Sequence, residues 1–212
     1  MGIDVEIATE ALHRMGYEPE FKLIVWENKN KLLEDGEVDC IWGCFSMNGR
    51  EDKYLWAGPY LYSRQMVAVR IDSEIQKLKD LTGKMIAVQE TSKAEEYFLR
   101  SDFEGIPDVS LVYCFSNMDE VFAALRKNYV EAICGHESAL ISFINTAPDE
   151  YRLLDESFLY SALGVAFDIQ YDEEFVEELF KTLGDMMNDG TIAAIVGKYG
   201  LDAEKSLGRG ND

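Results

Sequence analysis

Basic residues are scarce in this chain of 212 residues, in which 20 lysines and arginines face 40 aspartates and glutamates and the formal net charge is −20. Proteins that bind nucleic acids neutralise phosphates with clustered lysine and arginine, and no basic stripe occurs in this sequence. Long hydrophobic runs are also missing: stretches such as residues 192–197 are far shorter than the roughly 20 apolar residues that span a bilayer. The sequence therefore predicts no nucleic-acid partner and no membrane-spanning helix.

Cysteine and histidine are rare as well, with four and two residues. The cysteines form no CxxC pair and lie at no metal-ligand spacing from histidine, so neither a metal nor another cofactor is predicted. Each lies in an apolar, strand-like run, and we expect buried thiols at Cys40, Cys44, Cys114 and Cys134. Residues 1–6 carry two acids before any apolar stretch, a pattern unlike a secretory signal peptide.

Apolar side chains are abundant: they make up 47% of the residues, which suffices for a full hydrophobic core in one large domain or two small ones. Their spacing alternates between a helical period and short runs typical of buried strands. We expect helices over residues 7–15, 28–35, 118–125, 137–145, 173–187 and 191–199, and strands over residues 21–26, 38–42, 60–69, 84–88, 109–113, 130–134 and 164–167. Such alternation predicts an α/β fold, with mostly parallel sheets and helices on both faces.

Two segments of the chain, residues 33–43 and 125–135, match each other without a gap. Each ends a helix at a residue that tolerates left-handed geometry, Gly36 or Asn128. Each then continues as valine, an acid, an apolar residue, isoleucine, an apolar residue and glycine. The repeat indicates two similar lobes; the alternative is a chance likeness between two helix–strand turns.

The polar residues that follow the two matching strands are candidates for a binding site. Cys44 and Ser46 follow the first strand, and His136 and Glu137 follow the second. In open parallel sheets, ligands bind beyond the carboxyl ends of the strands. We therefore expect these residues to face each other across a cleft.

Four phrases, in order along the chain, carry a resemblance to a known family. They are Gly2-Ile3-Asp4-Val5-Glu6-Ile7 before the first helix; residues 40–50 with Trp56-Ala57-Gly58-Pro59-Tyr60; residues 81–97, which read LTGKMIAVQETSKAEEY; and Asp189-Gly190-Thr191 before a helix ending in Lys198-Tyr199. In these phrases the sequence resembles the type II periplasmic or extracellular solute-binding proteins of family 3, which bind polar amino acids for ABC transporters.

The resemblance implies a two-lobed type II fold, with the ligand cleft between the lobes and closure by a hinge. Lobe 1 would comprise residues 1–69 and 163–212, and lobe 2 residues 70–162, joined by two crossover strands. The family's first strand and its export signal are expected to be absent, because this sequence begins at the family's second strand region. An unpaired sheet edge would then favour pairing between chains, and the oligomeric state stays open.

The same resemblance implies a set of ligand contacts. Arg50 matches an arginine that clamps the α-carboxylate of the ligand with its planar fork of donors; the alternative is an exposed arginine paired with Glu51 or Asp52. Ser46 matches a second contact to this carboxylate, or is a turn residue. Cys44 matches a position whose backbone faces the amino group of the ligand.

The resemblance implies further ligand contacts earlier and later in the sequence. Trp26 matches an aromatic residue that stacks on the side chain of the ligand, or else belongs to the core. Ser92 and Lys93 match a Ser-Thr pair whose N–H groups open a helix onto the carboxylate, a favourable place for an anion. Ser92 is also suited to ordinary capping, in a capping box with Glu95.

Two departures from the family pattern bear on the ligand. His136 stands where the family has an aspartate that pairs with an α-ammonium group, and an imidazole cannot supply that fixed negative charge unless Glu137 turns inward. Lys93 replaces a threonine and adds positive charge beside the same site. Both changes favour a ligand with an acidic group. The alternative for His136 is a residue that satisfies local backbone groups at a helix start.

These features predict an extracytoplasmic protein that captures a small polar carboxylate, an amino acid or related metabolite, and presents it to an ABC permease. The same fold also serves as the ligand-sensing module of membrane receptor kinases or cyclases, which is the main alternative. A dehydratase or lyase acting on carboxylates is a third reading, with His136, Glu137, Glu90 and Lys93 as candidate acids and bases. No nucleophile motif or phosphate loop accompanies them, so we expect no enzyme.

Overall fold

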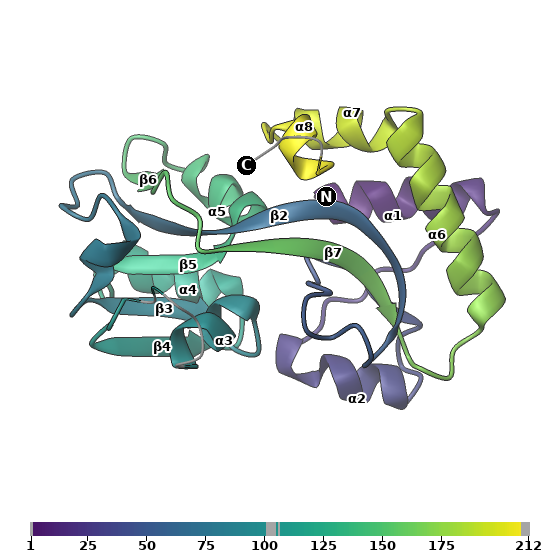
Figure 1. The fold of residues 1–212 in the computed structure, drawn as a ribbon, viewed down its shortest axis with the longest axis horizontal. Helices are drawn as coiled ribbons and strands as arrows, with labels where there is room; N and C mark the ends of the chain where they lie inside the picture. Colours follow the sequence, from purple (N-terminus) through teal and green to yellow (C-terminus); the bar gives the residue numbers. More distant parts are fainter. Residues whose placement is uncertain (1, 101–104, 106, 209–212) are drawn as a thin grey trace. The chain divides into compact units, whose positions relative to one another are not determined.

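The computed structural model describes residues 2–100, 105 and 107–208, and helices alternate with strands along this part of the chain (Figure 1). The helices are α1 (Ile3–Arg14), α2 (Lys29–Glu34), α3 (Lys93–Leu99), α4 (Met118–Arg126), α5 (Glu137–Ile144), α6 (Glu173–Asn188), α7 (Thr191–Lys198) and α8 (Ala203–Ser206), with short 3-10 helices at Trp26–Asn28 and Leu78–Leu81. The strands are β1 (Cys40–Ile41), β2 (Leu55–Arg70), β3 (Met85–Gln89), β4 (Leu111–Phe115), β5 (Ala132–His136), β6 (Tyr151–Leu153) and β7 (Leu159–Phe167).

The strands follow the order β1-β7-β2-β5-β3-β4, and β6 also pairs with β2. β3 is parallel to both β4 and β5, whereas β1 is antiparallel to β7, and β2 is antiparallel to β5 and β6. The α/β class is confirmed, with a sheet that is mixed rather than mostly parallel. The difference arises because apolar periodicity marks which segments are strands and carries no information on their direction.

One expected strand is wrong. Residues 21–25 have no regular secondary structure and are followed by the 3-10 helix at Trp26–Asn28, and they take part in no strand pairing within the described part of the chain. Phe21, Leu23 and Val25 are more than half exposed, with Leu23 fully so. A strand needs a neighbour to satisfy its backbone groups, so alternation of apolar residues alone does not make one.

The chain divides into two compact units, which are described separately. Unit 1 comprises Met1–Ile24, Asn28–Ser63 and Ser161–Asp212, and unit 2 comprises Val25–Glu27 and Arg64–Tyr160. The main chain therefore passes between the units within β2, within β7 and at both ends of the short segment Val25–Glu27. The lobe boundaries expected at residues 69/70 and 162/163 fall within these same two strands, and the division into lobes that move stays a prediction.

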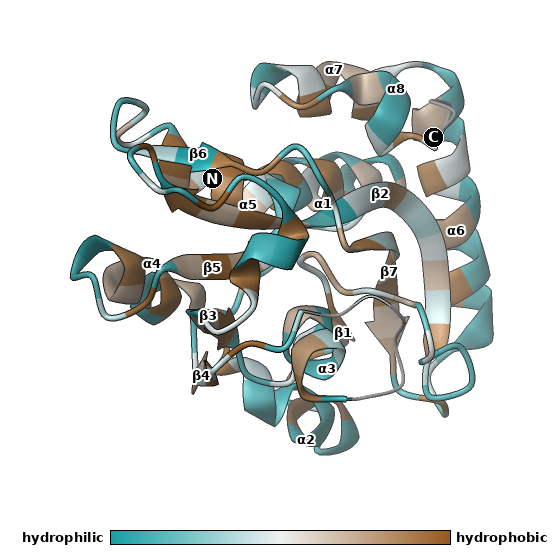
Figure 2. Ribbon diagram, turned by 60° about the vertical axis from the view of Figure 1, so that its left-hand side comes forward, coloured by the Kyte–Doolittle hydropathy of each residue, from teal (hydrophilic) through white to brown (hydrophobic). Residues whose placement is uncertain are grey.

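The core of unit 1 lies between its helices and the adjoining parts of β2 and β7. Helix α6 shows the cause most clearly: Val176, Leu179, Leu183 and Met186 recur at three- and four-residue spacing and are all buried. In Figure 2 hydrophobic and hydrophilic residues alternate along this helix. These side chains pack with Ile7 of α1 in one apolar cluster.

Unit 2 has a core on each face of its parallel strands. Successive residues of a strand point to opposite faces, and Cys134 of β5 packs with Val88 on one face while Ile133 packs with Ala87 on the other. Burial raises the pKa of the Cys134 thiol far above its usual value. The expectation of a buried thiol is thus correct for Cys134; the other three cysteines are partly buried, and all four are free.

Candidate functional site

The loop after β1 in unit 1 holds three of the predicted contact residues, Cys44, Ser46 and Arg50. Cys44 adopts a left-handed backbone conformation with φ of 50°, which is uncommon for a residue with a side chain. Its backbone N–H donates to the Asp4 carboxylate at 3.2 Å, and its thiol lies 3.4 Å from the same oxygen. Asp4, in the first turn of α1, therefore anchors the start of this loop.

Ser46 lies further along the loop and is almost fully buried, at 2% exposure. It forms an isolated antiparallel bridge with Leu163 of β7. Its hydroxyl donates to the side-chain oxygen of Asn48 at 3.1 Å, and that oxygen also accepts the N–H of Ala162 at 2.9 Å. The loop is thus fastened to β7 on the Ser46 side.

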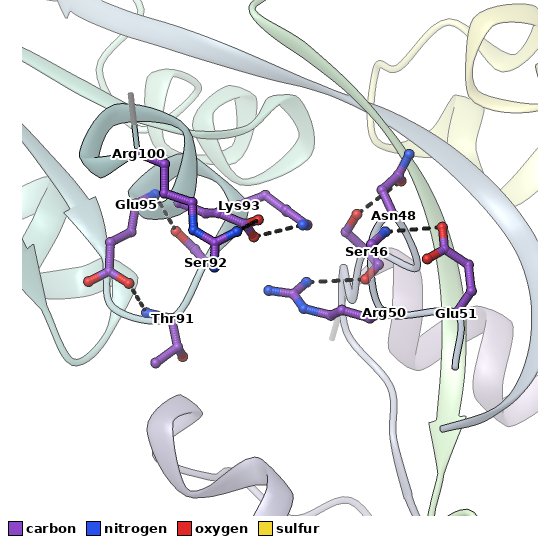
Figure 3. Close-up of polar contacts among 11 residues, drawn as sticks. Ser46, Asn48, Arg50, Glu51, Thr91, Ser92, Lys93, Glu95 and Arg100 are labelled. Carbon is purple, nitrogen blue, oxygen red and sulfur yellow. Dashed lines mark hydrogen bonds and ion pairs between the residues drawn. The ribbon is translucent and has the colours of Figure 1, made fainter. Parts of the chain in front are cut away.

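Arg50 closes the loop back on itself, as Figure 3 shows. Its Nη1 donates to the backbone oxygen of Ser46 at 3.1 Å. Its guanidinium carbon lies 5.2 Å from the centre of the Phe45 ring, and its backbone oxygen accepts the indole N–H of Trp56 at 3.1 Å. Both the backbone and the side chain of Arg50 are therefore held in place, which suits a group that receives a ligand in fixed geometry.

The second group of predicted residues lies in unit 2, at the start of α3. The Ser92 hydroxyl caps this helix by accepting the N–H of Glu95 at 3.2 Å. The expected capping box is only half formed, because the Glu95 carboxylate accepts the N–H of Thr91 at 2.7 Å (Figure 3). Thr91 has a left-handed φ of 54°, which places its N–H, one residue earlier than expected, within reach of that carboxylate.

Lys93 is buried, at 7% exposure, although it begins a helix. Its ammonium group donates to Glu96 at 2.7 Å, and the other carboxylate oxygen of Glu96 accepts Arg100 at 3.0 Å. Two cations, Lys93 and Arg100, therefore share the carboxylate of Glu96 at this position.

His136 ends β5 and precedes α5, and β5 is a parallel neighbour of β3, whose carboxyl end leads to Ser92 and Lys93. Its ring nitrogens lie 3.1 and 2.9 Å from the amide nitrogen of Gln65, its partner on β2. Glu137, the alternative source of negative charge, is paired with Arg64 of β2 through two hydrogen bonds, one of them at 3.0 Å. Its charge is therefore matched within unit 2.

Trp26 is the remaining predicted residue. It lies in the 3-10 helix Trp26–Asn28, is partly buried and groups with unit 2, whereas the sequence places it in lobe 1. A short segment changes unit here because packing, and not chain continuity, decides which core a residue joins.

The two helix ends that the internal repeat matches share a left-handed backbone conformation. Gly36 and Asn128 both adopt left-handed conformations, with φ of 66° and 56°. Each lies just after its helix, α2 or α4, and leads to a strand, β1 or β5. The candidate residues of the two units therefore follow equivalent helix–strand turns.

Two residues of interest have no clear signal in the sequence. Asp4 reads as an ordinary first-turn acid, yet it also accepts the Tyr60 hydroxyl at 2.6 Å. Burial raises the pKa of Asp4 above its ordinary value, against the lowering effect of the hydrogen bonds from Tyr60 and Cys44. Lys29 reads as a solvated helix residue, yet it is only 5% exposed. Long-range packing creates both environments.

Across residues 2–100, 105 and 107–208, no group of three or more histidine, cysteine, aspartate or glutamate side chains is arranged to hold a metal ion. No helix in the same ranges is long and apolar enough to cross a membrane.

The sequence profile of the bacterial extracellular solute-binding proteins, family 3, matches residues 1–202. The L-cystine-binding protein TcyA of Bacillus subtilis is 24% identical over 209 residues, which cover 96% of this chain and 74% of that protein. The glutamate-binding protein GluB of Corynebacterium efficiens is 25% identical over 206 residues, which cover 90% of this chain and 68% of that protein.

Solved structures give the same result for the fold. The crystal structure of Tv2483 bound to L-arginine matches with a TM-score of 0.82 and 28% identity, over 94% of this chain and 81% of that one. The ancestral amino acid-binding protein AncCDT-1, described as a precursor of cyclohexadienyl dehydratase, matches with a TM-score of 0.80 and 21% identity, over 94% of this chain and 85% of that one. The expected type II solute-binding fold is confirmed.

Proposed function

Since this chain belongs to family 3 of the bacterial extracellular solute-binding proteins, we propose that it captures a small carboxylate-bearing amino acid or related metabolite outside the cytoplasm and delivers it to an ABC permease. Matched relatives support this class of ligand, because they are named for binding cystine, glutamate and arginine. The ligand of this chain, and its permease, are our inference.

The geometry of Arg50 carries the proposal. A planar guanidinium binds a carboxylate best when it is oriented before the ligand arrives, since less conformational freedom is then lost on binding. The contacts of Arg50 with the Ser46 carbonyl and the Phe45 ring supply that orientation. In unit 2, Ser92 and Lys93 provide a second polar group suited to an anion. That both groups serve one ligand is a prediction from the sequence.

Binding without turnover is part of the proposal. Among the ionisable side chains that could act as acids or bases, two form ion pairs: Lys93 with Glu96, and Glu137 with Arg64. His136 likewise contacts Gln65. A ligand incubated with the protein should therefore be recovered unchanged, which NMR of the mixture would show.

A thermal-shift screen followed by calorimetry tests the proposal. L-Glutamate, L-glutamine, L-cystine, L-arginine and simple dicarboxylates would be offered to the protein. A ligand at 100 times its Kd stabilises the native state by about 2.7 kcal/mol, which a melting experiment detects readily. Arg50→Ala should abolish this shift, because it removes the carboxylate clamp.

Arg70→Ala is the matched control, because Arg70 ends β2 and pairs with Asp72 rather than with the loop of Arg50. It should leave the ligand-induced shift intact. The proposal fails if no compound in the panel raises the melting temperature, or if both variants bind as well as the native protein.

A further inference from the structure

An asparagine followed by a glycine lies in the middle of the loop that carries Ser46 and Arg50. Asn48-Gly49 is the only such pair in the sequence. The backbone N–H of Arg50 donates to the carbonyl oxygen of Met47 at 2.9 Å, so the pair forms the two central residues of a tight turn. Gly49 is exposed and has a left-handed φ of 68°. Because glycine has no side chain to shield its backbone nitrogen, that nitrogen can approach the neighbouring side-chain amide closely.

Two hydrogen bonds converge on the side-chain oxygen of Asn48. The Ser46 hydroxyl donates to this oxygen at 3.1 Å, and the N–H of Ala162 donates to it at 2.9 Å. Donors at about 2.7–3.1 Å from a carbonyl oxygen stabilise the negative charge that the oxygen gains when a nucleophile attacks its carbon. The contacts of Asn48 therefore favour attack on its side-chain carbon, Cγ.

A carboxylate lies beside the atom that would attack. The backbone N–H of Gly49 donates to the Glu51 carboxylate at 3.0 Å (Figure 3). A general base must lie within about 2.6–3.2 Å of the group that it deprotonates, and Glu51 meets this condition. The contacts of Ser46 and Glu51 thus address the two reacting groups, the side-chain carbonyl of Asn48 and the N–H of Gly49.

We propose that Asn48-Gly49 is a site of self-modification, at which Asn48 loses its side-chain amide. The backbone nitrogen of Gly49 bonds to Cγ of Asn48, and its proton passes to the Glu51 carboxylate. The bond between Cγ and Nδ2 then breaks, and the amide nitrogen leaves as ammonia with the proton from Glu51. Water hydrolyses the resulting succinimide at one carbonyl to give aspartate, or at the other to give isoaspartate.

Both products change the loop. Each adds a negative charge to the turn that ends at Arg50, and isoaspartate also lengthens the main chain there by one carbon atom. The reaction needs only water besides the protein itself. The state of this turn should therefore change with the age of the protein.

A comparison of folded and unfolded protein tests the proposal. Hydrogen bonds that merely immobilise an asparagine slow this reaction, whereas contacts that stabilise its transition state speed it up. The protein would be kept at mildly alkaline pH with and without urea, and the peptide that contains Asn48 would be followed by mass spectrometry. Folded protein should convert Asn48 faster than unfolded protein does, and faster than it converts Asn128, which precedes a tyrosine. Equal or slower conversion of Asn48 in the folded protein overturns the proposal.

Two variants test the assigned contacts. Glu51→Gln removes the base and Ser46→Ala removes one donor to the oxygen, and each should slow conversion of Asn48 by about tenfold or more. Asp52→Asn is the control, since it removes the same charge from the next residue, which is also exposed, and it should convert at the native rate.

Because Glu51 is exposed, its variant tests the proposal even if loss of the buried Ser46 hydroxyl disturbs the loop. Native conversion rates in both Glu51→Gln and Ser46→Ala would overturn the roles assigned to the two side chains. These measurements use no ligand, so their outcome is independent of the proposed function.

Discussion

The carboxylate of Asp4 accepts a hydrogen bond from the backbone N–H of Cys44 at 3.2 Å, across forty residues of chain. The contact joins the first turn of α1 to the loop that carries Ser46 and Arg50. It also supports the left-handed conformation of Cys44, which a residue with a side chain adopts at some cost. A partly buried acid that lies outside the predicted ligand contacts therefore shapes the loop that presents them.

Asp4 should make the stability of the protein depend on pH. Burial raises its folded-state pKa above the ordinary value of 3.8, so the folded state binds a proton more tightly than the unfolded state. This tighter proton binding adds to the free energy of unfolding. The contribution is fully present below pH 3.8 and is lost as pH rises through the folded-state pKa of Asp4. Asp4→Asn, which has only one acceptor oxygen, should be less stable than the native protein by about 1 kcal/mol in acid, and this gap should shrink as pH rises.

Urea denaturation at several pH values measures this effect. Tyr60→Phe removes a donor that lowers the pKa of Asp4, so it should extend the pH-dependent range upward. A gap between the native protein and Asp4→Asn that stays constant with pH would show that Asp4 titrates alike in the folded and unfolded states.

Ser92 should have a role in binding beyond capping. Ser92→Ala removes the cap of α3 and should cost about 1 kcal/mol of stability. Asn117→Ala removes an equivalent cap from α4, where the Asn117 side chain accepts the N–H of Glu120 at 3.0 Å, and should cost a similar amount. Only Ser92→Ala should also weaken ligand binding in calorimetry. Equal affinities in the two variants would leave Ser92 as a helix cap alone.

His136 should govern how the protein treats an α-amino group. His136→Asp places a carboxylate beside the amide nitrogen of Gln65, where it can accept a hydrogen bond and attract an ammonium group. The affinity for L-glutamate relative to glutarate, which lacks the amino group, should rise by about tenfold. His136→Asn has the same shape as His136→Asp without the charge and should show no such rise; a rise in both variants would exclude an electrostatic cause.

Asp189 should stabilise the link between α1 and α7 at neutral pH. Hydrogen bonds from Thr191 and Arg14 lower its pKa from 3.8 to about 2. The stability that they confer is therefore present above pH 3.8 and is lost as pH falls towards about 2. Asp189→Asn should lower the melting temperature at neutral pH, and the difference should narrow between about pH 4 and pH 2. A difference of equal size in acid would contradict this origin.

Helix caps and left-handed turn residues can be predicted from the sequence alone. Ser92 caps α3 as expected, and Gly36 and Asn128 adopt the left-handed conformations that the internal repeat predicts. These features depend on neighbouring residues in the chain, so the sequence contains the information directly. The expected strand over residues 21–26 fails for the opposite reason, because pairing requires a partner from elsewhere.

The sequence by itself determined the α/β class, most of the helices and strands and, through its family phrases, Arg50 and Ser92 as candidate contacts. Only the tertiary structure decided the surroundings of those candidates. Lys29 and Asp4 have ordinary neighbours along the chain. Lys29 is buried and Asp4 is partly buried because a ring or a loop from a distant segment packs against each of them. Charge and shape at a site depend on what long-range packing brings together, whereas periodicity and capping report only on the nearest turns of the chain.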